Sequence, residues 1–124
     1  RDTYAPGAYN MADHQVTGRA VFDAARDAGN RWVFRDQLVG GLEPWNGVRM
    51  VLATGSPRAT HGVDIAAHFD AGVASLAAHT AYLEAFGADG PEPTEMLEGF
   101  ARQAGTRLGV PLATSFELYP VNLL

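Results

Sequence analysis

Apolar residues in this chain are spaced as in a helix in some segments and as in a strand in others, and the two kinds of segment alternate. This alternation is the feature that most limits the fold. Alanine and valine residues spaced by four predict a helix over residues 13–28 that stops at Gly29. The other predicted elements are helices over 69–86 and 94–108 and strands over 48–53, 62–65 and 112–119. Interleaved helices and strands form layered structures. We therefore predict an α/β fold of three helices and short strands, as a single domain over residues 1–124.

Polar and turn-forming residues set the predicted element boundaries. Asp13 and Thr94 are predicted N-caps, because a short polar side chain can accept a hydrogen bond from a free backbone N–H. Residues 1–12 and 35–47 are predicted loops, the second with one helical turn. The last strand is expected to be antiparallel or to lie at a sheet edge. The spacing that indicates the first helix is that of Val16, Ala20, Ala24 and Ala28, with Val21 and Ala25 beside them.

Composition excludes several classes of function. The net charge is -5, and the nine basic residues, all arginine, are scattered rather than clustered. This argues against nucleic acid as a partner, since phosphate binding requires clustered positive charge. Cysteine is absent, so a metal would need His, Asp or Glu ligands. No apolar run approaches the ~18 residues that span a membrane. We expect a cytoplasmic protein without a membrane partner.

The predicted sheet is small for an independent α/β fold. It lacks the leading strand and the Gly-rich or acidic turn where such folds usually place ligands. The chain also begins at Arg1 rather than at a methionine. We expect it to be a fragment that lacks N-terminal strands of a longer protein.

An Asp-His pair, Asp13-His14, opens the first predicted helix within the segment Tyr9–Val21. This segment resembles the second signature of the LmbE-like (PIG-L) zinc-dependent N-deacetylases. The resemblance continues in order through Phe22–Phe34, Gly41–Trp45, Val48–Gly55, Thr60–Ile65 and Ser75–Leu83. The nearest branch is the actinobacterial one that includes mycothiol-conjugate amidases. The resemblance implies the C-terminal part of a Rossmann-like, LmbE-type layered fold.

The resemblance also implies a chemistry. Such enzymes hydrolyse carbon–nitrogen bonds other than peptide bonds, removing an acetyl or other acyl group from an amino sugar or related amide. Mycothiol-conjugate-like and N-acetylglucosaminyl compounds are the implied substrates. Two zinc ligands and a general base come from an early Pro-His-Pro-Asp-Asp motif, and the third ligand corresponds to His14. Another divalent metal is also compatible with such a site.

The early motif is absent from this chain. The chain alone is therefore expected to be inactive and to supply one zinc ligand. Whether it forms a homo-oligomer or associates with the missing N-terminal part stays open, as do the exact substrate and acyl group. An alternative function is a non-catalytic α/β binding or interaction module that keeps the deacetylase scaffold.

The resemblance also implies roles for further residues. Asp13 is assigned a supporting catalytic role, and Tyr9 lies where some relatives place a carbonyl-polarising tyrosine. Met11 replaces a histidine of many relatives, which leaves the general acid open. His79 and Tyr82 are candidate substrate contacts, with packing on one helix face as the alternative.

Two groups of residues are interpreted as structural. His61 and Asp64 are interpreted as a buried polar pair near a strand end. The aromatic side chains of Trp32, Phe34 and Trp45 are interpreted as packing residues, although Trp45 lies in a Gly/Pro-rich loop that could line a cleft.

Overall fold

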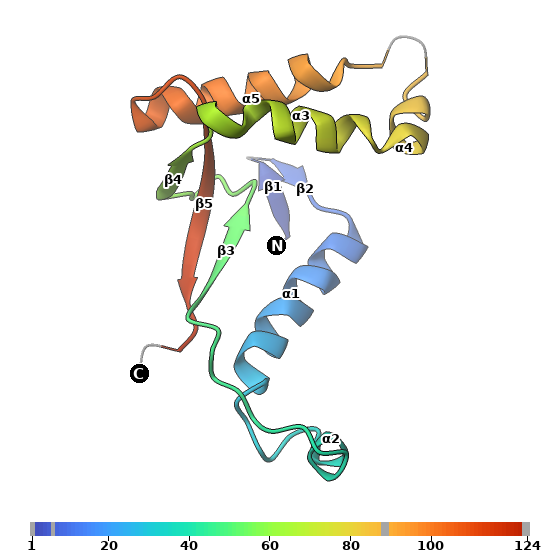
Figure 1. The fold of residues 1–124 in the computed structure, drawn as a ribbon, viewed down its shortest axis with the longest axis vertical. Coiled ribbons are helices and arrows are strands. Elements are labelled where there is room, and N and C mark those ends of the chain that lie inside the picture. Colours follow the sequence, from blue (N-terminus) through green and yellow to red (C-terminus); the bar gives the residue numbers. More distant parts are fainter. Residues whose placement is uncertain (1, 6, 88–89, 123–124) are drawn as a thin grey trace. The chain divides into compact units, whose positions relative to one another are not determined.

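The computed structural model describes residues 2–5, 7–87 and 90–122 (Figure 1). Helices and strands both occur, so the α/β prediction is confirmed at this level. The chain divides into two compact units, Arg1–Thr60 with Phe116–Leu124 and His61–Ser115. We call them unit 1 and unit 2 and describe each by itself. The Rossmann-like, LmbE-type fold and the single domain over residues 1–124 stay predictions.

Unit 1 begins with a short antiparallel pairing where a loop was predicted. Strand β1 (Thr3–Ala5) pairs with β2 (Ala8–Tyr9), and the Asn10 N–H donates to the Asp2 carbonyl at 2.7 Å. Gly7 lies between the strands at φ 73°, a backbone conformation that glycine adopts without strain. The prediction of a loop over residues 1–12 is therefore wrong, because this tight turn lets two very short strands pair.

Helix α1 (Ala12–Asp27) matches the first predicted helix closely. Its N-cap is Met11, without a capping side chain, so the prediction of Asp13 as N-cap is wrong. Asp13 lies in the first turn instead, where its carboxylate faces the positive end of the helix dipole.

One side of α1 packs against the last strand. The ring of Phe22 packs edge-to-face on Tyr119 of the last strand, with the ring centroids 4.8 Å apart. The less exposed residues on this side of α1 are Gln15, Gly18, Phe22 and Ala25. Among the residues whose spacing predicted this helix, Val16, Ala20, Ala24 and Ala28 are exposed and Ala25 is buried.

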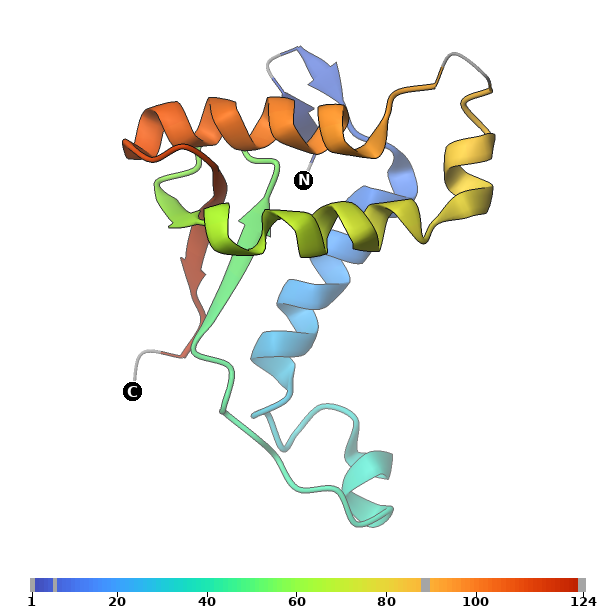
Figure 2. The ribbon, with the colours of Figure 1, turned by 45° about the horizontal axis from the view of Figure 1, so that its top comes forward.

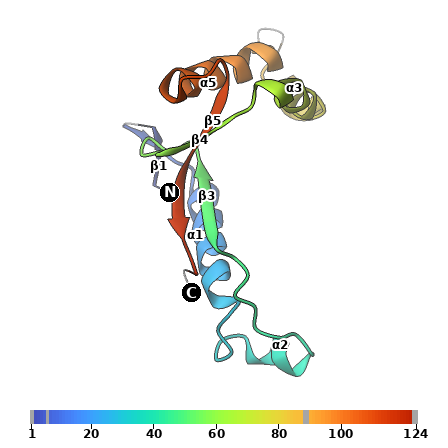
Figure 3. The ribbon, with the colours of Figure 1, turned by 60° about the vertical axis from the view of Figure 1, so that its left-hand side comes forward.

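After α1 the chain passes through the five-residue helix α2 (Arg35–Val39) and returns to strand β3 (Met50–Thr54) (Figure 3). The helical turn expected in residues 35–47 is thus present. β3 pairs antiparallel with β5 (Ala113–Pro120), in a register from Met50↔Pro120 to Thr54↔Phe116. The antiparallel prediction for the last strand is confirmed. The edge alternative is wrong, because the strand order is β3-β5-β4.

Unit 2 contains the two remaining predicted helical segments. Its elements are β4 (His61–Asp64), the 3-10 helix η1 (Ala66–His68), α3 (Phe69–Ala77), α4 (Thr80–Glu84) and α5 (Pro93–Leu108). The predicted helix over 69–86 is interrupted at His79, whose ψ of 57° is not helical. Thr94 is not the N-cap of α5: Glu92 is, and Pro93 opens the helix, a position that needs no free N–H.

Helices α3 and α5 lie side by side within unit 2 (Figure 2). The buried residues of this unit are small: Ala101 and Gly105 on α5, and Ala113 at the start of β5. A Cβ atom on Gly105 would meet the Val110 carbonyl oxygen at 2.5 Å. The backbone after α5 therefore approaches the helix at a distance that only glycine permits. None of the helices in the described parts of the chain is long and apolar enough to cross a membrane.

Candidate functional site

The residues around His14 form a local hydrogen-bonded arrangement at the start of α1. Asn10 Oδ1 accepts the Met11 N–H at 3.0 Å, which identifies that atom as the amide oxygen. His14 Nδ1 lies 3.1 Å from the same oxygen and donates to it. The imidazole proton is thereby assigned to Nδ1, which leaves the Nε2 lone pair available for a metal or a proton.

Asp13 lies beside this free nitrogen. Its Oδ2 is 3.9 Å from His14 Nε2, and both side chains are largely exposed. An imidazole nitrogen and a carboxylate oxygen are both zinc ligand types. Among the described residues, however, no group of three or more His, Asp or Glu is placed to hold a metal. These residues supply part of a metal site and do not form a complete one.

The structure places Tyr9 in the same unit as Asp13 and His14, at the end of β2. Its side chain is 74 % exposed, and among the described residues no hydrogen bond joins it to Asp13 or His14. Its role in polarising a carbonyl stays a prediction.

His79 and Tyr82 belong to unit 2. His79 Nδ1 donates to the Ser75 carbonyl at 2.8 Å, across the break between α3 and α4. The Tyr82 ring packs edge-to-face on Phe86, with centroids 5.1 Å apart. Both contacts are local and stabilise the helix ends. The roles of His79 and Tyr82 as substrate contacts stay predictions.

The interpretation of His61 and Asp64 as a buried pair is wrong, because both residues are exposed. Asp64 Oδ1 accepts the Ala66 N–H at 2.9 Å. An aspartate that precedes a helical turn often makes this bond, which removes the need for a buried partner. The packing interpretation of Trp32, Phe34 and Trp45 is also wrong, since their side chains are 75 %, 60 % and 60 % exposed.

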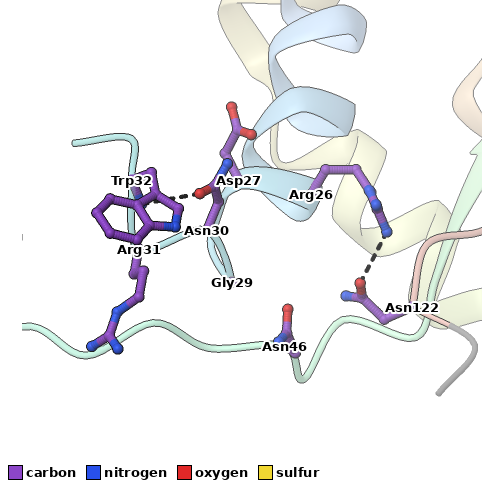
Figure 4. A pocket seen from close by; sticks show the side chains of 8 residues that line it. All are labelled: Arg26, Asp27, Gly29, Asn30, Arg31, Trp32, Asn46 and Asn122. Carbon is purple, nitrogen blue, oxygen red and sulfur yellow. Dashed lines mark hydrogen bonds between the residues drawn. The ribbon is translucent and has the colours of Figure 1, made fainter. Parts of the chain in front are cut away.

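A hollow of about 410 Å³ lies at the other end of α1, and sequence reasoning missed it (Figure 4). Three short stretches of unit 1 line it, around Arg26–Trp32, Asn46 and Asn122. Arg26 donates to Asn122 Oδ1 at 3.2 Å and to the Val121 carbonyl at 2.5 Å. The only sequence signal was the polar Gly29-Asn30 helix stop beside an aromatic residue.

No protein-family model matches the chain, and no curated protein is significantly similar to it. The likeness to LmbE-like deacetylases therefore depends on the ordered motifs between residues 9 and 87.

Proposed function

We propose that the protein is a zinc-dependent N-deacetylase or amidase, and that His14 is one of its metal ligands. The observation that carries this proposal is the bond from His14 Nδ1 to Asn10 Oδ1. Metal-binding histidines usually donate their second ring N–H to an oxygen acceptor, which orients the ring toward the metal. Asn10 would be that acceptor, and Nε2 would be the ligand atom.

The substrate would be an N-acylated amino sugar or a related conjugate. Bound zinc would polarise the amide carbonyl and lower the pKa of a bound water. Asp13 would add negative charge beside Nε2 and support the metal. Two further ligands and the general base would come from outside the described residues.

A second candidate is a non-catalytic interaction module. Exposed apolar side chains of unit 1 favour it, among them Met11, Val16 and Val21, which are 64 %, 69 % and 50 % exposed. Large apolar side chains left in contact with water are typical of a surface that another polypeptide covers. This candidate needs no metal.

The test is the zinc content and deacetylase activity of the full-length natural protein and three variants. His14→Ala is expected to lose stoichiometric zinc and turnover. Asn10→Ala should lower zinc affinity roughly 10- to 100-fold, as loss of an orienting partner does elsewhere. Asn10→Asp keeps an acceptor oxygen and should restore most of that affinity.

His68→Ala is the matched control, because His68 is exposed and belongs to unit 2. It should bind zinc like the unchanged protein. Full zinc and full turnover in His14→Ala would refute the assignment. Absence of zinc and activity from the unchanged protein would favour the interaction module.

A further inference from the structure

We propose that the hollow at the C-terminal end of α1 binds a small saccharide that carries a negatively charged group. This inference is independent of the zinc proposal. Arg26 lies twelve residues after His14 on the same helix. At 1.5 Å per residue, about 18 Å separates the two positions along the helix axis.

An unpaired aromatic ring forms one wall of the hollow. Trp32 is 75 % exposed, and its ring packs on no other aromatic ring within the described residues. The backbone N–H of Trp32 donates to Asn30 Oδ1 at 3.0 Å. This hydrogen bond fixes the main chain at Trp32. The face of an indole is electron-rich and attracts the C–H groups of a sugar ring.

Side-chain amides also line the hollow, from Asn30, Asn46 and Asn122 (Figure 4). A Cβ atom on Gly29 would lie 1.6 Å from Asn46 Oδ1, so glycine is what allows the Asn46 side chain to approach the end of α1. The Trp45 N–H donates to the Ala28 carbonyl at 2.7 Å and holds this loop in place. A side-chain amide both donates and accepts hydrogen bonds. It can therefore bind two neighbouring hydroxyl groups of a sugar, one as donor and one as acceptor.

Two arginines give the hollow a net positive charge, since Asp27 is the one acid among its lining residues. Arg26 is anchored to Val121 and Asn122. Arg31 makes no hydrogen bond or ion pair with any described part of the chain, so its guanidinium is free for a ligand. A guanidinium pairs with carboxylate or phosphate through two parallel hydrogen bonds.

Polar side chains dominate the lining, and this excludes a purely apolar ligand. The volume of about 410 Å³ lies in the range of small-ligand sites, roughly 300–1,000 Å³. One aromatic ring, several side-chain amides and a guanidinium without a partner among the described residues together match a sugar with a phosphate or carboxylate.

The experiment is a titration with glucose 6-phosphate followed by the fluorescence of Trp32. A Trp45→Phe background makes Trp32 the sole tryptophan, since the chain has two. We expect a saturable change with a dissociation constant in the millimolar range. Arg31→Gln should weaken binding at least tenfold. Arg35→Gln is the matched control, because Arg35 is exposed and lies outside the hollow.

Titrations with other ligands test whether both the sugar ring and the phosphate are recognised. Glucose alone and inorganic phosphate alone should each bind at least tenfold more weakly than glucose 6-phosphate. Equal binding of inorganic phosphate, or tighter binding of adenosine monophosphate, would overturn the saccharide assignment. Absence of saturation, or an equal loss in Arg35→Gln, would overturn the site. The fluorescence titration does not depend on bound zinc. A negative result would therefore contradict the saccharide proposal and leave the deacetylase proposal untouched.

Discussion

The two compact units of this chain are stabilised by different means. Unit 2 is one continuous stretch, His61–Ser115, and it closes around small residues that let backbone approach backbone. Unit 1 joins segments that are distant in sequence through the β3–β5 pairing, the Phe22–Tyr119 ring contact and side-chain hydrogen bonds. Ser56 Oγ donates to Glu117 Oε2 at 2.6 Å across 61 positions, and Arg26 donates to the Val121 carbonyl across 95 positions. Unit 2 should therefore be sensitive to added volume, and unit 1 to lost polar partners.

This difference bears on function. Unit 1 carries His14, Asp13 and the hollow beside Trp32, and it also exposes apolar side chains on α1 and β3. Both proposed functions therefore depend on residues of unit 1.

The largest expected effect is in unit 2. Gly105→Ala should lower the free energy of unfolding by about 2–3 kcal/mol, because the new Cβ would meet the carbonyl oxygens of Val110 and Pro111 at 2.5 Å and 2.8 Å. Gly99→Ala on the same helix meets nothing within 4 Å and should stabilise the protein by about 0.5–1 kcal/mol. Urea unfolding with amide exchange of α5 measures both. Equal stability of the two variants would show that unit 2 tolerates added volume.

The next effect is in unit 1. Glu117→Ala should cost about 1–2 kcal/mol, because it leaves the buried Ser56 hydroxyl without its acceptor. Arg58→Ala should cost under about 1 kcal/mol, since its side chain is 73 % exposed and its pair with Glu117 is screened by water. Chemical unfolding monitored by amide exchange of β3 and β5 is the measurement. A larger loss in Arg58→Ala would mean that the ion pair, not the Ser56 bond, stabilises this region.

The smallest expected change in the free energy of unfolding is at the C-terminal end of α1. Arg26→Ala should cost about 1 kcal/mol through its lost bonds to Val121 and Asn122. Arg19→Ala removes only an exposed pair with Asp23 at 3.8 Å and should cost roughly 0.3–0.5 kcal/mol. Thermal melts of both variants provide the comparison. If the two losses are equal, the long-range anchor contributes nothing beyond an ordinary surface pair.

Local patterns predicted the principal elements because their signals lie within a few residues. The alanine spacing located α1, the alternation of apolar residues located β3 and β5, and Gly109, at φ 81°, ended α5 as expected. The break at His79 was missed. An apolar stripe continues through it, and the interrupting bond to the Ser75 carbonyl is a detail of side-chain geometry.

The sequence by itself determined where most helices and strands lie, and it placed His14 at the start of a helix. The tertiary structure decided which face of α1 turns inward, that β5 lies between β3 and β4, and that Arg26, Asn46 and Asn122 line one hollow. The physical reason is the range of the interactions. Backbone hydrogen bonds and turn conformations depend on near neighbours, whereas the inward side of α1 packs on Tyr119, a residue far along the chain.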